Sequence, residues 1–156
     1  MAHVPVMLNE VMEFLDPKPN QNFVDCTLGD GGHALAVLER IAPNGKVLGI
    51  DADPQAIADI RNWKLEIRNL ERLIPVHGNF RNIGSIVNEQ QFSPIHGILL
   101  DLGFSSSTLE RGRGFSFEKD ELLDMRFDTV CGIRAAEIVN GWNQKQLTEL
   151  LREYGE

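Results

Sequence analysis

Carboxylates and glycines follow one another closely in the segment FVDCTLGDGGH, residues 23–33. Asp25 ends a short apolar run, Asp30 lies within the glycine-rich turn, and Asp51 ends the next apolar run, KVLGI. A glycine-rich turn between a strand and a helix brings backbone N–H groups to a ligand, and an acid at the next strand end accepts hydrogen bonds from ribose hydroxyls. The pattern therefore predicts a site for a ligand that contains a ribose.

Two classes of ligand fit this spacing. Gly29, Gly31 and Ala34 match the G-x-G-x-x-G/A pattern of dinucleotide-binding proteins, and Asp51 lies where their ribose-binding acid is found. Asp25 and Asp30 would repel a pyrophosphate, however, whereas they would attract the sulfonium and ammonium groups of S-adenosylmethionine. The charges favour S-adenosylmethionine, and a preference for NADH in a binding assay would support the dehydrogenase alternative.

Each part of S-adenosylmethionine has a predicted partner in the sequence. Its carboxylate would meet N–H groups at the start of a helix, those of Gly31, Gly32 and His33. Asp51 would accept the ribose hydroxyls, Asn79 and Phe80 would flank the adenine, and Asp101 would face the transferred group. A purely structural role remains an alternative for three of these residues. Phe80 could be a core residue, Asp101 could cap a turn, and His33 could simply be part of the helix start.

Strand and helix patterns alternate over the first hundred residues and predict the elements that position these groups. The apolar runs without polar alternation, typical of strands covered on both faces, are FVDC, KVLGI, LIPVH and GILLD. The helical patterns between them are HALAVLERI, stopped by PNG at residues 43–45, a helix from Pro54 behind Asp53 as a cap, and residues 81–89. This order predicts a parallel α/β sheet whose strand ends share one edge.

The character of the sequence changes beyond Asp101. Residues 105–128 have no long period, and their arginines, Arg111, Arg113 and Arg126, are either phosphate contacts or ordinary surface residues. Two helices are predicted to close the chain, one at residues 133–140 and one at 144–154 behind Asn143 as a cap.

Composition limits the protein class. The 156 residues are 42% hydrophobic and carry a formal charge of −8, so the chain suits one sizeable core and has no overall basic field for nucleic acid. Cys26 and Cys131 form no C-x-x-C pair, and the histidines have no metal-ligand spacing, so neither a disulfide framework nor a metal site is predicted. No basic-then-apolar leader or membrane-spanning run is present, which predicts a soluble cytoplasmic protein without membrane association.

Nine motifs in register give the sequence a family resemblance. It resembles the bacterial 16S rRNA (cytosine-N4)-methyltransferases, called RsmH or MraW. The resemblance runs from His3 to Glu156, over what corresponds to the N-terminal half of the family. The motifs that carry it are HVPVMLNEV, VDCTLGDGGH, GIDADPQAI, HGNF, HGILLDLGFSS, RGFSF, LDMRFD, AAEIVN and LREYGE.

The resemblance implies a Rossmann-like class I methyltransferase fold with parallel strands in the order 3-2-1-4, and transfer of a methyl group from S-adenosylmethionine to a cytosine amine in 16S rRNA. It implies a cofactor site at Gly31, Gly32, His33, Asp51, Phe80 and Asp101. A further family contact, a glutamine, corresponds here to Thr108. The catalytic residue is not assigned, although Ser105 and Ser106 follow Asp101 closely enough to contribute.

Length is the main departure, because family members are roughly twice as long, as expected for a methyltransferase core with an insertion. The resemblance then implies a partial cofactor core at 1–104 and the start of a helical substrate-recognition segment at 105–156. The fourth strand would form an open edge, covered by the last helices, a second copy or a complementing chain. Two functional alternatives stay open. One is an incomplete fragment or partner protein that binds S-adenosylmethionine, and the other is a methyltransferase for another nucleobase or a small molecule.

Overall fold

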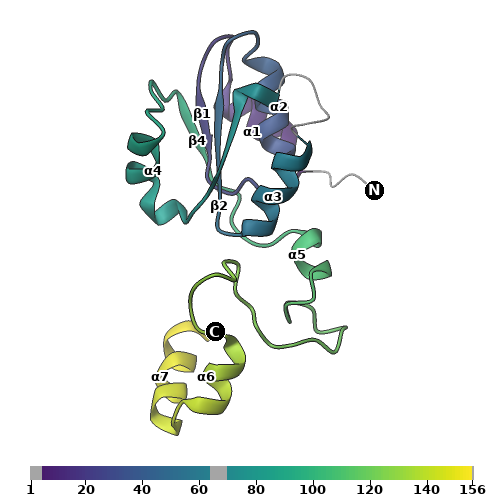
Figure 1. The fold of residues 1–156 in the computed structure, drawn as a ribbon, viewed down its shortest axis with the longest axis vertical. Helices are drawn as coiled ribbons and strands as arrows, with labels where there is room; N and C mark the ends of the chain where they lie inside the picture. Colours follow the sequence, from purple (N-terminus) through teal and green to yellow (C-terminus); the bar gives the residue numbers. More distant parts are fainter. Residues whose placement is uncertain (1–4, 64–69, 156) are drawn as a thin grey trace. The chain divides into compact units, whose positions relative to one another are not determined.

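The computed structural model of the chain describes residues 5–63 and 70–155. They fall into two compact units, Met1–Gly103 and Phe104–Glu156, each of which is described by itself (Figure 1). The boundary lies one residue from the division expected between 104 and 105. The assignment of the units to cofactor and substrate recognition remains a prediction.

A four-stranded parallel sheet forms the centre of the first unit. Its strands lie in the order β3-β2-β1-β4, which confirms the predicted order. They span Phe23–Asp25 (β1), Val47–Asp51 (β2), Leu73–His77 (β3) and Gly97–Leu99 (β4). Asp25, the last residue of β1, pairs in register with Gly49 of β2 and with Leu99 of β4. The register therefore aligns the carboxyl ends of the two central strands within two residues of each other.

Helices cover both faces of this sheet. The first unit contains α1 (Leu8–Leu15), α2 (Gly32–Arg40), α3 (Pro54–Trp63) and α4 (Ile83–Glu89), with 3-10 turns at Leu70–Arg72 and Phe80–Asn82. In Figure 1, α1, α2 and α3 lie on one face and α4 on the other. Asp53 begins α3 as expected, since its carboxylate accepts the Gln55 N–H at 2.9 Å. The first helix, α1, has no counterpart among the predicted elements.

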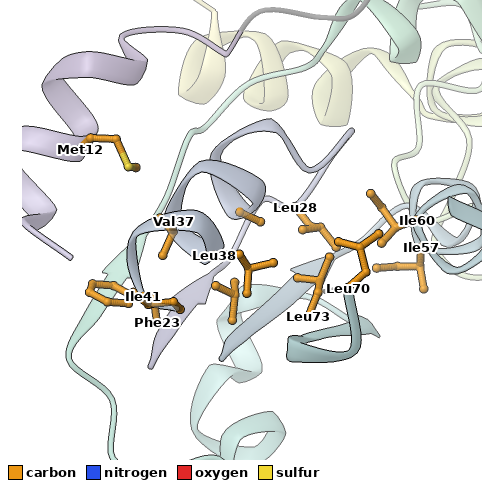
Figure 2. Packing of buried hydrophobic residues seen from close by; sticks show 12 residues of the cluster. Met12, Phe23, Leu28, Val37, Leu38, Ile41, Ile57, Ile60, Leu70 and Leu73 are labelled. Carbon is orange, nitrogen blue, oxygen red and sulfur yellow. The ribbon is translucent and has the colours of Figure 1, made fainter. Parts of the chain in front are cut away.

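Alternating strand residues separate the core into two clusters. Phe23, Val47 and Leu73 belong to the cluster that contains Leu38 of α2 and Ile57 of α3. Figure 2 shows Phe23 and Leu73 among these residues. Val24, Leu48 and Ile50 point to the opposite face and pack with Ile86 of α4 and with Phe92. Full burial of one such side chain contributes about 1.5–3 kcal/mol to the free energy of folding. These two apolar layers therefore stabilise the sheet that carries the polar edge.

The strand at the sheet's edge, β4, is shorter than predicted. It ends at Leu99 instead of Asp101, because its partner β1 spans only three residues and leaves the ladder after Asp25. Within the described residues no strand pairs with the other side of β4. Ile98 and Leu100 are 47% and 48% exposed, so this edge is open and apolar, as the sequence indicated.

A matched pair of glycine substitutions tests the packing of this unit. Gly45 is buried, and a Cβ there would press against the carbonyl oxygen of Gln21 and lie 2.7 Å from that of Ile41. Gly84, in α4, has open space around it. We expect Gly45→Ala to lower the free energy of unfolding by about 1–3 kcal/mol through overpacking. Gly84→Ala should raise the free energy of unfolding by about 0.5–1 kcal/mol, because alanine has the higher helix propensity. Urea unfolding of both variants measures these changes. If both substitutions changed the free energy of unfolding in the same direction, this packing would be contradicted.

The second unit is mainly helical at its end. Its helices are α5 (Ser106–Glu110), α6 (Ala135–Gly141) and α7 (Gln144–Tyr154). The two closing helices confirm the prediction, with α6 starting two residues later than expected. Asn143 caps α7 in a capping box, in which its side chain accepts the Gln146 N–H and the Gln146 side chain accepts the Asn143 N–H.

Candidate cofactor site at the sheet edge

The carboxyl ends of the strands bring the predicted polar residues of the first unit to one edge. Asp25 and Asp51 end β1 and β2, and Asp101 follows β4 by two residues. Phe80 follows β3 by three residues. The glycine-rich turn runs from β1 into α2 at the same edge. This is the place at which open parallel sheets bind ligands, as the spacing predicted.

Asp51 is held rigidly by two backbone amides. Its Oδ2 accepts the N–H of Gly29 at 2.7 Å, and its Oδ1 accepts the N–H of Asp53 at 2.8 Å. Each carboxylate oxygen can accept more than one hydrogen bond, so an oxygen that accepts an amide N–H can also accept from a hydroxyl. The carboxylate is half-buried and orientated before any ligand arrives.

The start of α2 differs from the prediction in one donor. Gly31 precedes the helix with φ of 77°, a left-handed conformation that favours glycine. Its N–H already donates to the carbonyl of Leu28 at 2.7 Å, so it cannot serve a ligand carboxylate in this conformation. Gly32 and His33 are the first residues of α2, where N–H groups have no acceptor within the helix. The anion-binding role remains a prediction, and in this conformation it concerns these two amides.

Asp25 lies beneath the loop and is 4% exposed. Its Oδ1 accepts the N–H of Thr27 at 3.0 Å and faces the Thr27 hydroxyl at 3.5 Å. Burial raises the pKa of Asp25 to about 6, with a further increase from the charge of Asp51, while the Thr27 N–H and nearby His33 act in the opposite direction. A buried negative charge at this position would attract a cationic ligand.

Asp101 is connected to the loop through two residues. The Thr27 hydroxyl accepts its N–H at 2.8 Å, and His33 Nδ1 lies 3.8 Å from its Oδ2. The carboxylate remains half-exposed, which leaves it open to a ligand. Sequence reasoning missed Thr27, because a hydroxyl that contacts Asp25 in β1 and Asp101 beyond β4 has no signature in spacing along the chain.

The surroundings of Phe80 and Thr108 do not test their predicted contacts with a cofactor. Phe80 is 40% exposed in the 3-10 turn after β3, where a ring can still cover a flat ligand, and neighbouring Asn79 uses its side-chain oxygen to accept the N–H of Arg81 at 2.9 Å. Thr108 belongs to α5 in the second unit and is 6% exposed, with its N–H 3.3 Å from Ser105 Oγ. Contacts of Phe80 and Thr108 with a cofactor remain predictions.

Two of the arginines proposed as phosphate contacts hold their own segment together. Arg126 binds Asp124 through two nitrogens, at 2.6 and 2.8 Å, and this bond lowers the pKa of Asp124 to about 2. Arg113 donates to the carbonyl of Phe127 at 2.9 Å. The structural alternative is therefore favoured for both side chains. Ser105 caps α5, and its contribution to catalysis remains a prediction.

Residues 5–63 and 70–155 contain neither a metal-binding cluster nor a membrane-spanning helix. Over those residues, no group of three or more histidines, cysteines or acids gathers in a way that could hold a metal ion. None of the helices described there is long and apolar enough to cross a membrane.

The sequence matches the model of the MraW methylase family over residues 1–156. It is 48% identical to Ribosomal RNA small subunit methyltransferase H of Thermomicrobium roseum over 156 residues, which cover 99% of this chain and 47% of the relative. It is 44% identical to the protein of the same name from Syntrophotalea carbinolica over 155 residues, covering 99% of this chain and 49% of the relative. The chain thus spans about half the length of the curated relatives it matches.

Solved structures support the fold. A putative rRNA methylase from Clostridium thermocellum superposes with a TM-score of 0.56 at 20% identity, covering 67% of this chain and 55% of that one. A protein-L-isoaspartate O-methyltransferase superposes with a TM-score of 0.50 at 18% identity, covering 64% of this chain and 29% of that one. At these identities the likeness concerns the Rossmann-like architecture of the first unit and not the reaction.

Proposed function

Since the chain belongs to the MraW methylase family, as its match over residues 1–156 shows, we propose that it binds S-adenosylmethionine at the carboxyl edge of its sheet. The observation that carries the proposal is the Asp51 carboxylate, fixed by the amides of Gly29 and Asp53 beside the glycine-rich turn. A carboxylate fixed in this way is an acceptor for two neighbouring ribose hydroxyls. The same geometry alone would also suit a dinucleotide, and the charges at the edge decide between the two ligands.

The residues present fit the chemical groups of S-adenosylmethionine. The N–H groups of Gly32 and His33 would bind its carboxylate at the positive end of α2. Asp25 and Asp101 would attract its ammonium and sulfonium groups, and Phe80 would cover the adenine. A pyrophosphate would instead meet the negative charges of these acids. When bound, S-adenosylmethionine supplies an electrophilic methyl group.

The proposed reaction is methylation of a cytosine N4 amine in 16S rRNA, the activity implied by the family resemblance. The amine's lone pair is delocalised into the ring, so the protein must hold the nitrogen in line with the methyl group. Asp101, half-exposed two residues beyond β4, would accept a hydrogen bond from that amine and so favour its pyramidal form. The target base would have to leave its stack to reach this edge.

The match covers about half of the relatives' length, so methyl transfer to RNA is proposed here from the family as a whole. A fragment that binds S-adenosylmethionine without transferring its methyl group is the alternative that the assay below must exclude. The open edge of β4 would be covered by a complementing chain or a second copy, in the cytoplasm where ribosomal subunits are present.

Calorimetric titration of the purified chain with S-adenosylmethionine and, separately, NADH tests the first step. Saturable binding of S-adenosylmethionine and none of NADH would support the proposal. Transfer of a labelled methyl group to small ribosomal subunits that lack this modification then distinguishes an enzyme from a binding fragment. A folded chain that binds neither ligand would contradict the cofactor assignment, and a preference for NADH would replace it with the dehydrogenase alternative.

A further inference from the structure

The imidazole of His33 lies between two segments that are distant in sequence. Its Nε2 is 3.0 Å from the carbonyl oxygen of Val6, and its Nδ1 is 3.8 Å from Oδ2 of Asp101. The ring is 7% exposed, so these neighbours, together with the buried carboxylate of Asp25, define its polar surroundings. Both ring nitrogens are therefore directed at protein atoms, and neither points freely into solvent.

The contact with Val6 fixes which nitrogen carries a hydrogen. A carbonyl oxygen only accepts, so Nε2 donates to Val6. Nδ1 can donate to the Asp101 carboxylate only in the imidazolium form of the ring, in which both nitrogens carry a hydrogen, and the pairing proposed below is that of this form. The separation of 3.8 Å is longer than a hydrogen bond but within the range of an ion pair, and a small rotation of the half-exposed carboxylate would shorten it.

The carbonyl of Val6 is itself held in place. Its neighbour Pro5 packs so closely on Gly32 that a Cβ on that glycine would overlap the proline ring. The N-terminal segment thus lies against the first turn of α2 and fixes the ring at Nε2. From the opposite side, the hydroxyl of Thr27 fixes the backbone of Asp101, so that only its carboxylate remains to be orientated.

We propose that the His33 side chain is a positioning residue that acts through Asp101, directing the Asp101 carboxylate toward the ligand instead of touching the cofactor itself. The backbone N–H of His33 keeps its separate role at the start of α2. The inference rests on the proposed function, because the ligand is S-adenosylmethionine. It differs from a purely structural role, in which the ring serves only to hold the N-terminal segment through Val6.

Two substitutions separate these roles because they keep different halves of the imidazole. The amide nitrogen of asparagine can occupy the position of Nδ1, so His33→Asn keeps a donor for Asp101 and loses the contact with Val6. The longer glutamine reaches the position of Nε2, so His33→Gln keeps the contact with Val6 and loses the donor for Asp101. Both variants are compared by calorimetric titration with S-adenosylmethionine and by thermal unfolding.

We expect His33→Gln to weaken binding about tenfold while its unfolding temperature stays near that of the wild type. His33→Asn should weaken binding less, about twofold, while lowering the unfolding temperature more. In addition, Asp101→Asn should weaken binding in the wild type but have little further effect in His33→Gln, because the two residues act as one unit. The proposal would be overturned if His33→Asn bound S-adenosylmethionine more weakly than His33→Gln, so that affinity followed thermal stability. Equal affinities of the two variants would also overturn it.

The unfolding measurements keep the test independent of the proposed function. If the wild type binds no S-adenosylmethionine, the proposed function fails, and the coupling is then read from the free energies of unfolding of the wild type, His33→Gln, Asp101→Asn and the double variant. Non-additive effects would still support a pairing of the two side chains. Additive effects would overturn it, whether or not the cofactor binds.

Discussion

Replacement of Asp51 by alanine should weaken the binding of S-adenosylmethionine about 100-fold, because two hydrogen bonds from ribose hydroxyls to a carboxylate are lost at about 1.5 kcal/mol each. Gly29 and Asp53 hold this carboxylate in place, so little affinity is lost to ordering it in the wild type. Calorimetric titration of both proteins at the same pH measures the difference. An affinity within threefold of the wild type would place the ribose elsewhere.

A change of charge alone must be separated from this effect. Asp59→Ala removes the same charge from α3, where Asp59 accepts a hydrogen bond from Gln55 at 2.8 Å and lies outside the glycine-rich turn. We expect that variant to bind as the wild type does. Asp51→Ala also frees two backbone amides, so its free energy of unfolding should fall by about 1–3 kcal/mol. Titration is therefore performed at a temperature at which both variants are folded.

The sheet could be predicted from the sequence because its determinants are local. KVLGI and LIPVH are apolar without alternation, which is the pattern of strands buried on both faces, and glycine-rich or polar turns mark where they end. The strand order followed from the family resemblance. Asp51 and Asp25 were found for the same reason, since the last residue of a parallel strand lies at the ligand edge whatever the details of packing.

What could not be predicted depends on contacts between distant segments. The contact of Val6 with His33 joins residues 27 apart, and that of Thr27 with Asp101 joins residues 74 apart. Neither leaves a periodic signal. The engagement of the Gly31 amide by Leu28 depends on the exact path of the turn, which spacing does not determine. Helix α1, by contrast, had a usable signal, because Leu8, Met12 and Leu15 have helical spacing.

Asp25 gives the largest expected effect on stability. Its pKa is raised in the folded chain, whereas the pKa of most acids is lowered by folding, so its contribution to stability falls as the pH rises. Burial raises its pKa from the ordinary 3.8 to about 6, so between these values the folded chain binds a proton that the unfolded chain does not. Stability from this group is therefore lost as pH rises from about 4 to about 6, by about 3 kcal/mol. Asp25→Asn, which keeps an oxygen for Thr27, should be more stable than the wild type by about 2 kcal/mol at pH 8 and similar to it at pH 4. Urea unfolding at several pH values measures this difference, and a constant difference would contradict the buried ionisation.

The same carboxylate makes cofactor binding depend on pH in the opposite sense. A ligand with sulfonium and ammonium groups favours the ionised form of Asp25, so below pH of about 6 binding must first remove a proton from it. Wild-type affinity should then fall by up to about tenfold per pH unit below this point, while Asp25→Asn binds more weakly at pH 8 but with little dependence on pH. On this prediction, the charge that lowers the stability of the wild type at neutral pH is the charge that strengthens binding of the ligand. Equal pH profiles for the two proteins would assign Asp25 to the structure of the loop alone.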